Sequence, residues 1–238
     1  MVSDKKQGHG DGDGGALPIP IAINPLRWLE ADEVMAKFGQ GVPSAENLLD
    51  FVRGPFTRAS LPECIDRYRR ASAVDGQLFA LPMPERLQRG LLNPLHNAKA
   101  EFILGHFLSC IGLCGVVAEV LCVLRFDAAE VQCGGGPLDA AKQKQLWGRP
   151  FSKLPHVQRI SALHALGLIV STTQSRLQAI ASTRNKYMHI YGQEGGSEAD
   201  DALDVYRSTC EVVGLILGLD VLEGRLVIHP DILRFLQK

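Results

Sequence analysis

The apolar run from Phe102 to Leu124 constrains the fold of this 238-residue chain more than any other segment. Between Ile103 and Leu124 only His106 and Glu119 are strongly polar. A stretch of roughly 20 apolar residues is long enough to cross a bilayer as a helix. Small residues recur along it, and they suit close packing among neighbouring helices: Gly105, Ser109, Gly112, Gly115 and Ala118. We therefore predict that this run is the buried central helix of a soluble bundle and not a membrane-spanning helix. No membrane partner is expected.

Signals for helix starts and ends recur along the chain, whereas alternating strand patterns are almost absent. Asn24-Pro25 opens one predicted helix, because asparagine caps free N–H groups and proline at the first helical position loses no hydrogen bond. Ser60 with Glu63 forms a capping box that predicts another start. The expected fold class is all-α, an antiparallel helical bundle with a helical N-terminal extension.

Further along the chain, turns and caps separate the predicted helices. Glycine ends two short ones, and a capping box at Ser171–Gln174 starts a longer one that stops before Gly192. The remaining expected elements are a turn at Gly134-Gly135-Gly136-Pro137, helices over 138–147, 154–166 and 197–217, a strand over 226–228 and a helical turn opened by Pro230.

These patterns divide the chain into four predicted parts. Residues 1–15 are polar and lack the apolar core of a signal peptide, so we expect a disordered tail. A helical extension over 16–92, a helical bundle over 93–218 and a short tail over 219–238 packed on the bundle follow. Six cysteines without Cys-x-x-Cys spacing favour reduced thiols in the cytoplasm.

Charge is distributed unevenly although the formal net charge is only -1. Residues 94–191 carry ten Lys or Arg against five Asp or Glu, whereas residues 192–238 carry four against nine. The positive field of the first segment favours an anionic ligand such as RNA. Attraction between two helices of one bundle is an equally good explanation.

The densest chemistry lies in the eight residues from Arg184 to Tyr191, at the end of a predicted helix. A guanidinium, a carboxamide, an imidazole and two phenols occur together there, which suits both phosphate binding and proton transfer. On a regular helix Arg184 and His189 lie about 140° apart around the axis. Asn185 and His189 share a face. Because one helix does not easily aim Arg184 and His189 at the same atom, a symmetric homodimer that pools residues from two chains is expected.

Arg184-Asn185 followed by His189 resembles the signature of the HEPN superfamily of helical-bundle proteins, which is Arg, four to six residues, then His, commonly with a polar residue after the Arg. Tyr191 completes the Arg-x4-His-x-Tyr form seen in HEPN toxins paired with nucleotidyltransferase antitoxins. The resemblance covers the motif helix and, more loosely, residues 93–218, including the apolar helix with an acid, Glu119, toward its end.

The resemblance implies a metal-independent endoribonuclease that acts in stress or phage defence and needs no cofactor. The ribose 2′-hydroxyl would attack the adjacent phosphate, with His189 as general acid or base and Arg184 neutralising the developing charge. Asn185 would orient the imidazole or hold phosphate. Tyr191 is then a candidate modification site, and RNA, a second copy of the chain and a nucleotidyltransferase antitoxin are the candidate partners.

Other readings stay open from the sequence. The helical protein can serve as a non-catalytic nucleotide-binding or protein-interaction module. His106, Cys110 and Cys114 lie on one helical stripe with zinc-ligand chemistry, but a fourth ligand is missing and core packing is favoured. Arg67, Arg69 and Arg70 could track a nucleic-acid backbone or form a solvated face. No nucleophile stands near His156 or His164 in the sequence.

Overall fold

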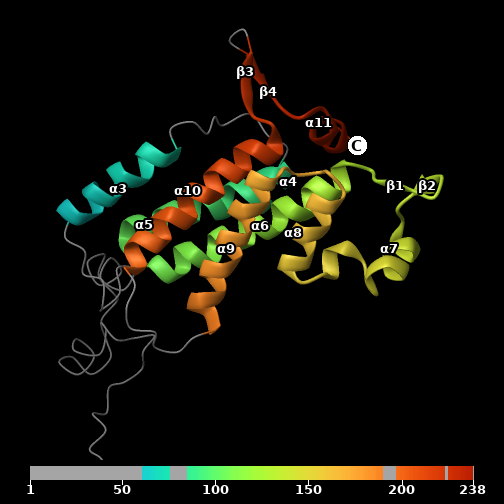
Figure 1. The fold of residues 1–238 in the computed structure, drawn as a ribbon. Coiled ribbons are helices and arrows are strands. Elements are labelled where there is room, and N and C mark those ends of the chain that lie inside the picture. The colour runs from blue at the N-terminus through green and yellow to red at the C-terminus, as the bar shows by residue number, and fades with distance from the viewer. Residues whose placement is uncertain (1–60, 76–84, 190–196, 223–224, 238) are drawn as a thin grey trace, which may run out of the picture. The chain divides into compact units, whose positions relative to one another are not determined.

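The computed structural model describes residues 61–75, 85–189, 197–222 and 225–237 (Figure 1). The chain divides into two compact units, 1–58 and 59–238, and every described residue belongs to the second. Within these residues the protein is a bundle of helices with two minimal hairpins, which confirms the predicted all-α class. The expected tail over 1–15, the helix at Asn24-Pro25, the cap at Ser60 and the candidate modification site Tyr191 lie outside the described residues.

The described elements follow one another as a series of helices. Their bounds are α3 (Leu61–Asp75), α4 (Glu85–Leu87), the π-helical η1 (Gln88–Leu92), α5 (Asn93–Leu104), α6 (Phe107–Ala128), β1 (Gln132–Cys133), β2 (Gly136–Pro137), α7 (Ala140–Trp147), the 3-10 turn η2 (Phe151–Lys153), α8 (His156–Ala165), α9 (Ser171–His189), α10 (Glu198–Leu217), β3 (Asp220–Leu222), β4 (Arg225–Val227) and α11 (Pro230–Leu236).

Helix α6 is the central element, because α5, α8, α9, α10 and α11 all pack against it (Figure 1). Its buried face includes Ile111, Val117 and Leu121, each fully shielded from solvent. Among the described residues it is the one helix long and apolar enough to cross a membrane, and half of its most apolar window is buried inside the bundle. The predicted buried central helix is thus confirmed, with different bounds.

The apolar run is two helices and not one, so the prediction of a single helix from Phe102 to Leu124 was wrong at its start. Phe102 belongs to α5, and Gly105 ends that helix in the left-handed conformation with φ 87°. The N–H of His106 then donates to the carbonyl of Glu101 at 2.8 Å, closing the helix end. Hydropathy stays high across Gly105, so the pattern conceals the break.

Helix α10 begins within one residue of its predicted start, whereas the capping box predicted at the start of α9 was wrong. The Ser197 side chain accepts from the N–H of Asp200, as expected of an N-cap. At α9 the N–H of Gln174 donates to the carbonyl of Val170 at 3.0 Å, so the helix begins one residue before a Ser171 capping box would place it. The Ser171 hydroxyl instead lies 3.2 Å from Nε2 of His164.

The expected glycine turn forms the smallest of hairpins. Gln132 pairs with Pro137 and Cys133 with Gly136, and the two residues between them have φ values of 60° and 79°. Two consecutive left-handed residues define the turn that matches the twist of a hairpin, and Gly134-Gly135 adopt it without steric cost.

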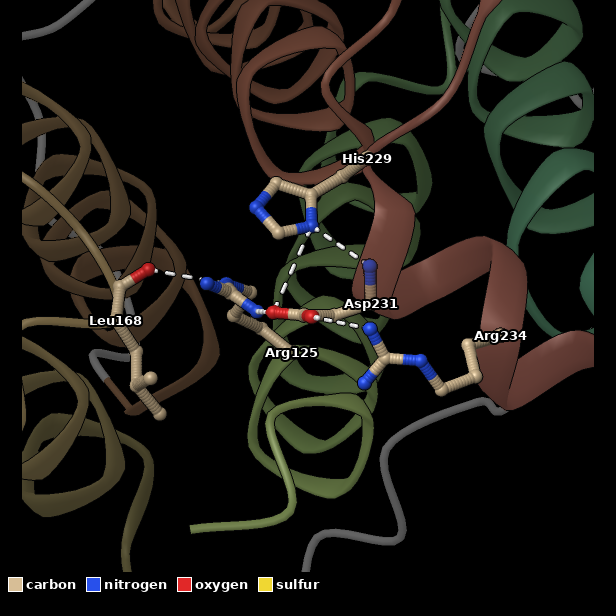
Figure 2. A network of polar contacts seen from close by, with 5 residues as sticks. All are labelled: Arg125, Leu168, His229, Asp231 and Arg234. Atoms are coloured by element: carbon tan, nitrogen blue, oxygen red, sulfur yellow. Dashed lines mark hydrogen bonds and ion pairs between the residues drawn. The ribbon is translucent and has the colours of Figure 1, made fainter.

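The C-terminal segment folds back onto the end of α6 through Arg125 (Figure 2). Nε of Arg125 donates to the carbonyl of Leu168 at 3.0 Å, and Nη1 lies 3.4 Å from Asp231. Asp231 also faces Arg234 at 3.7 Å and Nδ1 of His229 at 3.8 Å. One side chain therefore connects α6, the loop before α9 and α11. An antiparallel hairpin, β3–β4, precedes α11. Only its second strand was predicted from the sequence.

Two ion pairs within the bundle join the basic segment of the sequence to the acidic segment. Lys186 pairs with Asp201 at 2.8 Å and Arg176 with Glu211 at 2.9 Å, and both pairs join α9 to α10. The basic and the acidic segments are therefore adjacent helices of one bundle. This finding supports the intramolecular explanation of the charge pattern, although partly exposed ion pairs add little to stability.

Helix α9 approaches α6 closely because α6 has glycine at the contact. A Cβ added at Gly115 would overlap Cδ of Arg184, whereas a Cβ at Gly112 would lie 3.2 Å from Cε of Met188. The aliphatic stem of Arg184 thus passes directly over the α6 backbone.

Gly115→Ala is expected to destabilise the protein by about 1–3 kcal/mol, because the new methyl group meets the middle of the Arg184 side chain, which cannot move freely. Gly112→Ala is the matched control. Its methyl group meets only the flexible end of Met188, and the higher helix propensity of alanine, about 1 kcal/mol, offsets the contact. Urea unfolding of the two variants measures the difference, and equal free energies of unfolding would contradict the proposed packing.

Candidate functional site

The Arg184–Tyr191 motif occupies the last turns of α9, which stays helical through His189. The Arg184 side chain faces α6 and is 34% exposed, whereas Asn185 is exposed to solvent. Position 189 follows Asn185 by four residues and so lies on the Asn185 face of the helix. The His189 side chain is outside the described part of the structure. The structure therefore describes the side chains of Arg184 and Asn185, and for His189 only its place on the helix.

A carboxylate on α6 joins two arginines from two other helices. Nη1 of Arg184 donates to Oε1 of Glu119, and Nη2 of Arg159 donates to Oε2 at 2.8 Å. Arg159, from α8, is 8% exposed and also directs Nη1 to the Glu119 carbonyl at 3.5 Å. We call Arg159, Glu119 and Arg184 the Arg–Glu–Arg cluster. Glu119 was noted in the sequence, whereas Arg159 was missed.

The Arg–Glu–Arg cluster keeps Glu119 ionised. Burial raises the pKa of the carboxyl, but the hydrogen bond and charge of Arg159, together with the charge of Arg184, outweigh burial and hold the pKa below its usual value. With two guanidinium groups and one carboxylate, the cluster carries a formal charge of +1 at neutral pH.

His156 lies beside this cluster in the first turn of α8, three residues before Arg159 and on the same side of the helix. Both ring nitrogens are buried without a hydrogen-bond partner among the described residues. Burial is the main cause that lowers the pKa of His156 to about 4; Glu119 opposes the shift, while the charges of Arg159 and Arg184 add to it. The imidazole is thus neutral at physiological pH. The sequence gives no sign that His156 would lie beside two arginines with its ring nitrogens buried.

A cavity of about 410 Å³ opens beside the cluster, with Arg159, Glu119 and Arg184 in its wall. The rest of the lining is mostly apolar and comes from α4, η1, α6 and α11; it includes Leu87, Val116, Val120, Val123, Phe235 and Leu236. Pockets of this size, apolar with a few convergent polar groups, are typical of small-molecule sites. Arg184 of the motif thus reaches this cavity.

The residues between Arg184 and His189 attach the end of α9 to α10. Nζ of Lys186 lies 2.8 Å from Oδ2 of Asp201, and the Tyr187 hydroxyl donates to the same oxygen at 2.7 Å. The Lys186 hydrogen bond, and next that of Tyr187, lower the pKa of Asp201. Two bonds to one carboxylate fix the rotation of the helix about its axis.

The other candidate residues from the sequence, the His106–Cys110–Cys114 stripe and the Arg67–Arg70 cluster, make contacts within the bundle. Nδ1 of His106 lies 2.8 Å from Glu101, while Cys110 and Cys114 are buried in the core. The described residues hold no group of three or more His, Cys, Asp or Glu side chains placed to bind a metal ion. Arg67 donates to the Ile103 carbonyl at 3.0 Å and Arg70 pairs with Asp200, so the basic cluster is divided between two contacts.

Comparison of the chain with protein-family models, with curated proteins and with solved structures finds no match. Function is therefore inferred from the geometry of the site and from the Arg-x4-His resemblance.

His156 should make stability depend on pH. A histidine whose pKa is depressed in the folded state binds protons more readily when unfolded, so its contribution is complete above pH 6.5 and is lost as the pH falls toward 4. The loss is roughly 3 kcal/mol at most. In His156→Asn, the free energy of unfolding measured in urea should fall by about 1–3 kcal/mol less over this interval than in the wild type. Parallel curves for the two proteins would show that His156 is already paired or solvated.

Proposed function

We propose that the protein is a HEPN-like, metal-independent endoribonuclease of the cytoplasm, in which the ribose 2′-hydroxyl attacks the adjacent phosphate. The observation that carries this proposal is the position of Arg184. The motif arginine is neither enclosed in the core nor free on the surface: it is one-third exposed, lines a cavity and is held by Glu119. That placement suits a group that must meet a phosphate in a fixed orientation.

Glu119 supports a catalytic role for Arg184 through orientation. It accepts a hydrogen bond from one terminal nitrogen, Nη1, which restricts the orientation of the guanidinium. The planar fork has five N–H donors, so phosphate oxygens can still be bound in a bidentate manner. In this proposal Arg184 neutralises the charge that develops on the phosphoryl oxygens, His189 transfers the proton, and the exposed Asn185 orients the imidazole or holds phosphate.

The geometry of α9 supports a homodimer. Because the helix is continuous through His189, no break within it reduces the angle of about 140° between positions 184 and 189. An exposed apolar strip also lies beside the motif, formed by Leu108 and Val116 of α6 and Met188 of α9, which are 45%, 42% and 46% exposed. We propose this strip as the subunit contact that lets Arg184 of one chain and His189 of the other share a groove.

The HEPN resemblance also suggests a biological role for the proposed cleavage. Cleavage of RNA would serve stress or phage defence, with a nucleotidyltransferase antitoxin that acts on Tyr191.

A second function is favoured by the same contacts. Arg184 is paired with Glu119, and Lys186 and Tyr187 are paired with Asp201, so each of these side chains stabilises the bundle without any reaction. A non-catalytic nucleotide-binding or protein-interaction module is therefore the alternative.

An RNA-cleavage assay separates the two. His189→Ala should lose at least the roughly 10²-fold typical of a general acid or base, and Arg184→Lys should also be impaired because an ammonium group lacks the planar fork. The matched control is Arg176→Lys, since Arg176 lies on the same helix and pairs with Glu211 on the surface. It should cleave like the wild type.

The chemistry of the substrate gives a further control. Chelators should have no effect, and RNA with 2′-deoxyribose at the cleavage position should be inert, because the nucleophile is missing. Cleavage that requires a divalent metal, or that persists in His189→Ala, would refute this mechanism, and the absence of any cleavage would leave the interaction module as the better account.

Assembly is tested by light scattering after size exclusion. The wild type should be a dimer, and Val116→Asp should shift it to monomer because a carboxylate would be buried in the subunit contact. Val157→Asp is the control, since Val157 is 50% exposed on α8, outside the proposed strip. A monomeric, active wild type would refute the shared groove.

A further inference from the structure

The cavity beside the Arg–Glu–Arg cluster has charged groups at both ends, the cluster at one and Asp127 at the other, and its wall between them is mostly apolar. Along α6, Glu119 is followed by Val120 and Val123, which line the cavity, and then by Asp127. Eight residues of helix separate Glu119 from Asp127, a rise of about 12 Å. Phe235 and Leu236 of α11 complete the apolar wall. A ligand that fits this layout has a small polar head and an elongated apolar body.

The head group is defined by the arginines. Arg159 has a side chain only 9% exposed, and its Nε has no hydrogen-bond partner among the described residues. A buried donor without a partner is costly, and Arg184 directs only Nη1 to Glu119, so guanidinium N–H groups remain for the acceptor atoms of a ligand. The cluster carries one positive charge in excess, and the neighbouring His156 is neutral. A singly charged anion balances the cluster, and the two oxygens of a carboxylate match the guanidinium fork.

We propose that this cavity binds a small amphiphilic carboxylate, with its head at Arg159 and Arg184 and its apolar chain along Val120 and Val123 of α6 toward α11. Binding needs no RNA and no second subunit, so this site and the proposed ribonuclease activity can fail independently of each other.

Isothermal titration calorimetry of the full chain with octanoate tests the site. Octanoate should bind at one site per chain, and 1-octanol, which has the chain without the charge, should bind at least tenfold more weakly. Hexanoate should also bind more weakly, by about fourfold for each methylene group that it lacks, since a buried methylene contributes roughly 0.8 kcal/mol. Inorganic phosphate, which has no apolar chain, should bind much more weakly than octanoate. Equal affinity for octanoate and octanol, or binding of phosphate as tight as that of octanoate, would overturn the proposal.

Two variants locate the ligand. Val123→Trp fills the apolar part of the cavity and should weaken octanoate binding at least tenfold. Val170→Trp is its control, because Val170 is 64% exposed and does not line the cavity. Arg159→Gln should remove most of the preference for octanoate over octanol. Circular dichroism checks that each variant is folded. If Arg159→Gln does not fold, the ligand series and Val123→Trp still test the proposal. Unchanged octanoate binding in Val123→Trp would place the ligand elsewhere and overturn the proposal.

Discussion

The contact between Glu119 and its two arginines holds the functional part of the bundle together. One carboxylate on the central helix receives a guanidinium from α8 and another from α9, so three helices meet at a single side chain. Removal of one partner from a largely buried ion pair leaves the other charge uncompensated, which is more costly than the pair is stabilising. The position of α9, and with it the motif, therefore depends on this cluster as well as on the apolar core.

The sequence predicted the helices where local signals were strong. Ser197 and the glycines after α7 and α8 define ends that depend only on neighbouring residues, and those ends were found. The break at Gly105 was missed because apolar residues stand directly on both sides of the Gly105-His106 step. The β3–β4 hairpin was half missed because strands of three residues are too short to show alternation.

The site was harder to predict, since its contacts join distant parts of the chain. Arg184 and Glu119 are 65 residues apart and Arg159 and Glu119 are 40 apart, and no spacing rule links such positions. The motif helix and Glu119 on the apolar helix were each noted in the sequence, but not their contact. The angle of about 140° between Arg184 and His189 was also predicted from the sequence. The burial of His156 depends on how α8 packs against α6, and the cavity forms only where α11 packs back onto α6. Neither feature has a signal in the neighbouring sequence.

The crossing of Arg184 over Gly115 also constrains how this protein can change over evolutionary time. The helix packing that admits the arginine stem excludes every side chain with a Cβ at position 115. Loss of Arg184 would free that space for alanine or serine, whereas a chain that first acquired a larger residue at 115 would have to move α9. The two positions are therefore expected to vary together among related chains, and glycine at 115 would mark those in which the motif arginine still lies against the central helix.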